Sequence, residues 1–113
     1  MDPYHLISGG TLILAGVFIA WMAYAARNGS LQPNSWIGIR TPELMASEEK
    51  WRAGHKAASA TLFVSAAGTI VTGVISLFVS FDAVAIVAMV GIAWLLVFLF
   101  RGASQASKAA KAV

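Results

Sequence analysis

Three long apolar runs without a charged residue constrain this chain more than any other feature of its sequence. They cover residues 6–26, 57–81 and 83–100, with lengths of 21, 25 and 18 residues. A helix needs about 20 mostly apolar residues to cross a bilayer, within a range of roughly 17–25. Buried helices of a soluble bundle would show polar faces at helical spacing, and residues 86–100 show none. The runs therefore predict an integral membrane protein with three transmembrane helices.

The composition agrees with a chain whose main solvent is lipid. Charged residues make up 12% of the 113 residues, about half of what a soluble domain of this size uses. The chain has no cysteine, which excludes disulfides, thiolate metal sites and cysteine nucleophiles. Residues 23–26 resemble a signal-peptide cleavage site, but residues 1–5 lack the positive charge that such a peptide needs. We expect an uncleaved first helix.

The expected fold is one all-α membrane domain, 1–113, with transmembrane helices at about 6–27, 57–80 and 83–101. A polar segment, residues 28–56, connects the first two helices and is expected to form a cytoplasmic interfacial cap. The link of Ser80, Phe81 and Asp82 is so short that it predicts an antiparallel hairpin, with Asp82 as an N-cap. The short basic tail, residues 102–113, is expected to be a frayed helix end or disordered.

The positive residues predict the orientation of the chain. A chain with three spans has the polar segment and the tail on the same side of the membrane. All eight lysines and arginines lie on that side: Arg27, Arg40, Lys50, Arg52, Lys56, Arg101, Lys108 and Lys111. The N-terminus and the second link carry none. The positive-inside rule then predicts a multi-pass membrane protein with its N-terminus outside the cytoplasm and its C-terminus inside. The membrane topology and the attraction of positive residues to membrane lipids explain the net positive charge of the chain. No direct nucleic-acid partner is therefore expected.

The polar segment contains two helix-start signals. Thr41 followed by Pro42 predicts a short turn of helix near 42–46, and Ser47 followed by two glutamates predicts a second helix start. That second helix runs straight into the membrane or bends at Gly54. Trp51 and His55 are four residues apart and share a face. We expect these two side chains and Trp36 to converge at the ends of the helices.

The same segment resembles the signature of the SdpI family of small bacterial membrane proteins. That signature is an Asn-x-Trp-Ile-Gly-Ile-Arg-Thr-Pro run followed by Trp-x-x-x-His at the entry to a helix. The matching positions, taken as a binding site, are Asn34, Trp36, Gly38, Arg40, Thr41, Pro42, Trp51 and His55. The family's namesake protects a toxin-producing cell from its own secreted peptide toxin and holds a transcriptional repressor at the membrane. The namesake is larger, so the resemblance covers the three-helix unit.

Two side chains in the signature allow alternative interpretations. His55 could belong to a metal or proton site with nearby carboxylates, but His5 lies across the bilayer and no His-Glu-x-x-His spacing exists. We favour a hydrogen bond from His55 to a carboxylate or carbonyl and expect no metal site. Arg40 could bind a lipid phosphate or an acidic partner, or it could pair with a nearby glutamate such as Glu43 or one of residues 48–49.

The membrane helices are expected to pack rather than to transport. Small and hydroxyl residues recur along the second helix, which predicts close packing against both other helices; they are Ser65, Thr69, Thr72, Gly73, Ser76 and Ser80. No charge lies inside the spans, which argues against a transporter or a proton pump. Trp94, Phe98 and Phe100 are expected to face lipid or a partner rather than a cofactor.

These features lead to one expected function and one alternative. We expect a protein that is not an enzyme, with no catalytic residues and no cofactor, since no nucleophile has a recognisable base. Its resemblance implies immunity to a membrane-active peptide toxin or membrane-tethered signalling, by binding of a toxin, regulator or other membrane protein through the polar segment. The alternative is a small accessory subunit of a larger membrane complex that binds through its apolar helices.

Overall fold

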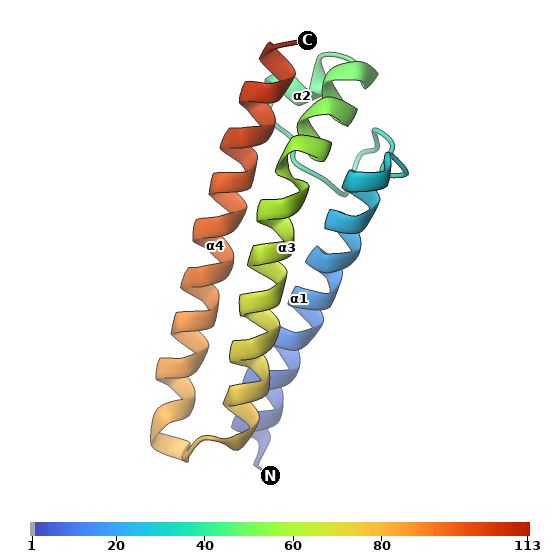
Figure 1. The fold of residues 1–113 in the computed structure, drawn as a ribbon. Coiled ribbons are helices and arrows are strands. Elements are labelled where there is room, and N and C mark those ends of the chain that lie inside the picture. Colours follow the sequence, from blue (N-terminus) through green and yellow to red (C-terminus); the bar gives the residue numbers. More distant parts are fainter. Residues whose placement is uncertain (1) are drawn as a thin grey trace.

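The computed structural model describes residues 2–113, which form three long helices and one short one. α1 spans Pro3–Asn28, α2 spans Pro42–Met45, α3 spans Glu48–Phe78 and α4 spans Phe81–Lys111. The three long helices run side by side, and α2 lies at the end of the bundle where the C-terminus also lies (Figure 1). A loop of residues 30–41 leads from α1 to α2.

The dimensions of the bundle suit a bilayer. Each of the three long helices is long and apolar enough to cross a membrane. The molecule measures 49 × 20 × 20 Å, whereas the hydrocarbon core of a bilayer is about 30 Å thick. The long axis therefore extends beyond the hydrocarbon and leaves the polar segment outside it. The prediction of an all-α membrane protein with three transmembrane helices is confirmed.

The two ends of the bundle differ in charge. The polar segment and the end of α4 meet at one end, and the N-terminus and the α3–α4 turn meet at the other (Figure 1). All eight lysines and arginines belong to the first end. This arrangement is the one that the three apolar runs predicted. Which end faces the cytoplasm stays a prediction.

The helix ends follow from local sequence signals with one exception. Gly29, at φ 78°, closes α1, and Ser47 accepts a hydrogen bond from the Lys50 N–H at 3.1 Å as the N-cap of α3. The predicted N-cap of α4 was wrong: Ser80 has the extended backbone of the N-cap, and Asp82 lies inside the first turn. A carboxylate there is still favourable because the helix dipole is positive at its N-terminus.

α3 is the central helix, as its small and hydroxyl residues predicted. Ser65, Thr69 and Ser76 are buried, and the Ser65 hydroxyl donates to the Leu95 carbonyl of α4 at 3.2 Å. On the α1 side, a Cβ added to Gly73 would lie 3.0 Å from the carbonyl oxygen of Gly9. The packing interpretation of these residues is confirmed, because their small size lets the helix backbones approach closely. It was wrong for Ser80, which is exposed and lies beyond the end of α3.

Two long helices extend further than the apolar runs suggested. α3 begins at Glu48 and continues through Gly54, so the membrane helix starts inside the polar segment. α4 continues to Lys111, and the tail predicted to be frayed or disordered is its last three turns. The Lys50 ammonium donates to the carbonyls of Ala110 and Val113, each at 2.8 Å. The tail is helical because the polar segment supplies it with packing and hydrogen-bond partners that the tail sequence alone does not reveal.

Candidate functional site

The centre of the polar segment is a buried pair of rings on α3. Trp51 and His55 are each 1% exposed, and their ring centroids lie 4.2 Å apart. Their spacing of four residues places them on one helix face, as predicted. The indole N–H of Trp51 donates to the Leu31 carbonyl at 2.9 Å, which fixes the start of the loop against α3.

The loop backbone lies directly on these rings at Gly38. This glycine has φ 122°, which side chains rarely tolerate, and a Cβ there would lie 2.8 Å from the Trp51 ring. The same Cβ would lie 2.9 Å from Nε2 of His55. Gly38 therefore serves two requirements: a left-handed backbone and a close approach that leaves no room for a side chain.

His55 is held as a neutral imidazole. Its Nε2 lies 2.8 Å from the backbone nitrogen of Ile39, and its Nδ1 lies 2.8 Å from the Trp51 carbonyl oxygen. A backbone N–H can only donate, so Nε2 accepts and Nδ1 carries the proton and donates. Burial lowers the pKa of His55, since desolvation disfavours the charged ring. The hydrogen-bonded interpretation of His55 is confirmed, with backbone groups rather than a carboxylate as its partners.

Asn34 organises the loop from within. Its Oδ1 accepts from the backbone N–H groups of Trp36 at 2.8 Å and Ile37 at 2.7 Å. Its Nδ2 donates to the carbonyls of Gln32 at 2.9 Å and Ile37 at 3.0 Å. One side chain thus satisfies four backbone groups. This local bonding is the reason that asparagine favours turns, and it gives the loop a defined shape without regular secondary structure.

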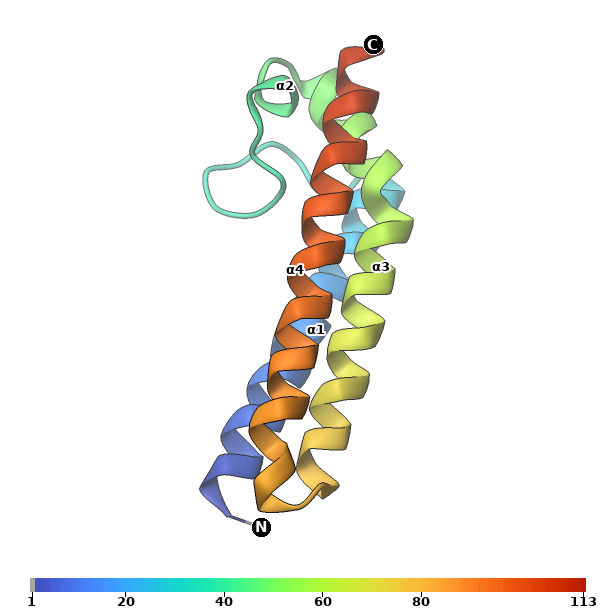
Figure 2. The ribbon, with the colours of Figure 1, turned by 90° about the vertical axis from the view of Figure 1, so that its left-hand side faces the viewer.

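Trp36 is the exception among the predicted site residues. The sequence predicted that it would converge with Trp51 and His55, and this was wrong: Trp36 is 87% exposed. Its backbone N–H donates to Asn34, which holds the Trp36 backbone in the turn and leaves its side chain exposed. Figure 2 shows the loop projecting from the side of the bundle beside α4. The other motif residues shape the loop, and Trp36 is the large side chain that the loop presents outward.

A protein-family model described as the SdpI/YfhL protein family matches residues 30–101. This stretch makes up more than half of the 113 residues and includes the loop, α2, α3 and most of α4. The chain belongs to the SdpI/YfhL protein family. No curated protein and no solved structure matches it. The resemblance predicted from the motif is confirmed, and both α1 and the tail lie outside the matched region.

In this SdpI/YfhL chain, Arg40 forms no ion pair with a glutamate in residues 2–113, and its binding to a lipid phosphate or an acidic partner stays a prediction. Its guanidinium donates to the Asn34 carbonyl, which adds another bond to the loop. Two of the three predicted glutamate partners are engaged elsewhere: Glu48 pairs with Arg52 at 2.7 Å, and Glu43 lies 3.6 Å from the Lys111 ammonium. Arg40 remains exposed, so its other donors are available to a ligand.

Thr41 and Pro42 connect the SdpI/YfhL loop to the tail. Pro42 begins α2 after Thr41 as N-cap, as predicted, and the Thr41 hydroxyl accepts a hydrogen bond from Ser107 at 2.9 Å. The sequence interpretation missed Ser107 and the rest of the tail. The tail sequence did contain a signal for a packed helix, because small residues recur at every fourth position. These residues are Gly102, Ala106 and Ala110, and all three are buried.

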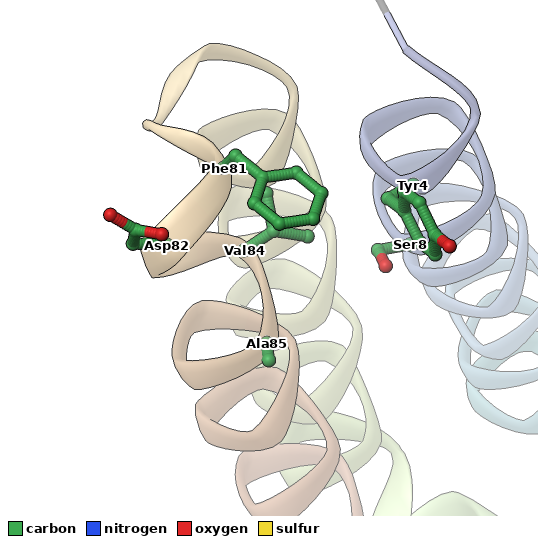
Figure 3. A pocket seen from close by; sticks show the side chains of 6 residues that line it. All are labelled: Tyr4, Ser8, Phe81, Asp82, Val84 and Ala85. Atoms are coloured by element: carbon green, nitrogen blue, oxygen red, sulfur yellow. The ribbon is translucent and has the colours of Figure 1, made fainter.

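A hollow lies at each end of the SdpI/YfhL bundle. One, of about 360 Å³, lies between the first turns of α1 and α4, far from the motif, with Tyr4, Ser8 and Phe81 in its lining. Asp82 points away from its centre (Figure 3), so few polar groups converge there. The other, of about 330 Å³, lies beside the motif and includes Asn34 in its lining. Residues 2–113 contain no group of three or more histidines, cysteines and carboxylates placed to hold a metal ion.

The neutral state of His55 predicts an acid-sensitive loop. Because the folded pKa is lowered, His55 contributes its full stabilisation above the unfolded value of 6.5 and loses it as the pH falls through the lowered pKa. Protonation removes the acceptor of the Ile39 N–H. We expect the protection factor of the Ile39 amide against hydrogen exchange to be constant above that value and to fall below it. His55→Gln should remove this dependence. A protection factor that rises on acidification would contradict the assignment.

Proposed function

We propose that this chain is a non-catalytic binding protein of the bacterial inner membrane that recognises its partner through Trp36 and the loop of residues 30–41. The partner is a membrane-active peptide toxin, in an immunity role, or a regulator held at the membrane. The observation that carries the proposal is the 87% exposure of Trp36 on a loop whose backbone is fixed by Asn34, Gly38 and His55.

Physical chemistry favours such a loop for recognition. Tryptophan is enriched among the residues that dominate binding energy, because it buries a large area with few rotatable bonds. A loop that is already ordered loses little conformational entropy on binding. Arg40 adds a cation on the same loop, which suits an acidic or amphipathic partner. The positive residues favour placing this end of the bundle in the cytoplasm, with the N-terminus outside.

Replacement of Trp36 with alanine tests the proposal. We expect Trp36→Ala to insert and accumulate normally but to lose about 30-fold or more in partner affinity, because it removes a central aromatic contact. The measurements are survival under toxin challenge and pull-down of a membrane-held regulator. Trp21→Ala is the matched control, since Trp21 is also exposed but belongs to α1. Full protection and full regulator binding by Trp36→Ala would overturn the proposal.

A second candidate is the accessory subunit of a larger membrane complex. An apolar hollow of about 310 Å³ on α4 favours it, with Val90, Ala93, Trp94, Val97 and Phe98 in its lining. A complex of this kind would bind through α4, so Val90→Leu and Val97→Leu would release the chain from a stoichiometric partner while Trp36→Ala would have no effect. Gentle solubilisation followed by mass measurement distinguishes the two candidates.

A further inference from the structure

A second hollow near the polar segment carries an excess of positive charge. It has a volume of about 250 Å³ and lies between the last turn of α1 and the start of α3. Its lining residues are Ala26, Arg27, Asn28, Gly29, Arg52, Ala53 and Lys56. A water molecule takes about 30 Å³ in the liquid, so the hollow has room for a four-oxygen anion such as a phosphate group.

Three cations from two helices surround this hollow with little compensation. Arg27 and Lys56 are exposed and form no ion pair with any group in residues 2–113. Arg52 pairs with Glu48, but only its Nη2 makes that contact, so other guanidinium donors remain. Asn28 adds an amide whose Oδ1 accepts from Ser30, which leaves its Nδ2 to donate. The hollow therefore offers several donors and a net positive charge.

The position of the hollow matches the level of lipid phosphates. Arg27 directly follows the apolar run of α1, and Lys56 directly precedes that of α3. The Arg27 guanidinium lies 5.7 Å from the ring centroid of Phe63, which is half-buried. Tyr24, on the last part of α1, is exposed on the membrane side of Arg27. The cations thus lie at the level of the lipid headgroups, and the aromatic and aliphatic surface lies at the level of the acyl chains.

We propose that this hollow, independently of the Trp36 loop, is a binding site for the phosphate group of an anionic phospholipid. The guanidinium groups of Arg27 and Arg52 have the planar fork that binds phosphate oxygens in pairs, and Lys56 adds a point charge. The exposed apolar surface of α1 on the membrane side of Arg27, which includes Tyr24, receives the acyl chains. The same chemistry would also bind a free phosphate-bearing solute, and the experiment separates these two sources.

The test counts lipids bound to the full chain released from a neutral detergent, by native mass spectrometry. We expect phosphatidylglycerol to bind with a stoichiometry of one and to exceed phosphatidylcholine. The double variant Arg27→Gln/Lys56→Gln should lose about tenfold or more in phosphatidylglycerol affinity, because two charge-assisted contacts are removed. Arg101→Gln/Lys108→Gln removes the same charge from exposed sites on α4 and should bind as the native chain does.

Each outcome decides the proposal. An equal loss in both double variants would mean diffuse attraction to basic residues and would overturn the site, as would an unchanged affinity in the first. Inorganic phosphate, titrated without lipid, identifies the source: displacement of phosphatidylglycerol only at high excess supports the lipid, and tight binding of phosphate alone overturns it in favour of a soluble anion. Circular dichroism of both variants should match the native chain, which shows that the fold is retained.

Discussion

Replacing Trp51 with alanine is expected to open the polar segment while the membrane helices remain in place. The side chain is 1% exposed, and its indole N–H holds the Leu31 carbonyl at 2.9 Å. Truncation of a buried tryptophan costs about 3–5 kcal/mol, from lost transfer free energy and the cavity left behind. The Ile39 amide, which the neighbouring His55 binds, should then exchange at least about a hundredfold faster, since about 1.4 kcal/mol is a factor of ten.

Two matched variants separate burial from hydrogen bonding in this result. Trp51→Phe keeps most of the apolar area but leaves the Leu31 carbonyl without its donor, so a smaller loss of about 1–3 kcal/mol is expected. Trp36→Ala removes the same side chain from an 87% exposed position and should change the stability by less than about 0.5 kcal/mol. Similar exchange rates in Trp51→Ala and Trp36→Ala would refute the placement of Trp51 at the centre of the segment.

The second large effect is expected for Gly38→Ala. The residue has φ 122°, and its new Cβ would lie 2.8 Å from the ring of Trp51 and 2.9 Å from His55. An unfavourable backbone conformation costs on the order of 1–3 kcal/mol. Overpacking against rigid rings costs about 1–3 kcal/mol more. The loop should therefore lose the contact between Ile39 and His55, which would appear as a change in the chemical shifts of the His55 ring and faster exchange of the Ile39 amide.

Gly29→Ala is the control for the backbone part of this effect. Gly29 also has a positive φ, 78°, but a Cβ there would meet nothing within 4 Å. Its substitution is therefore expected to cost only the left-handed backbone strain, about 1–2 kcal/mol. The difference between the two variants then combines the packing of the loop on Trp51 and His55 with the less favourable φ of Gly38. Equal costs would mean that the loop does not contact the rings.

The sequence determined the three membrane-spanning parts of the helices and where several helices begin or end. Three apolar runs fix the three spans, because a buried backbone in lipid must satisfy its own hydrogen bonds as a helix. Ser47, Thr41 with Pro42, and Gly29 mark helix ends through contacts within a few residues. These signals are local, so no knowledge of the partner segments is needed to interpret them.

The family motif was readable in the sequence, but the roles of its residues were not. Trp36 and Trp51 are the same residue type in the same polar segment, yet one is 87% exposed and the other 1%. Helical spacing identified the pair of Trp51 and His55. The turn around Asn34 decides where Trp36 points, and its hydrogen bonds depend on the path of the whole loop. Residue type alone cannot distinguish a side chain that builds a loop from one that the loop presents.

Only the tertiary structure decided how the polar segment and the C-terminal tail combine. The tail forms the last turns of α4 because Lys50 binds its carbonyls and Ser107 binds Thr41, contacts that join residues 60 and 66 positions apart. The excess charge between α1 and α3 likewise arises from Arg27 and Lys56, which are distant in the chain. By itself the sequence determined whether each segment lies in lipid or in water, through its hydrophobicity and local hydrogen bonding. The tertiary structure determined the neighbours of each side chain, because contacts between distant residues form only when the helices pack.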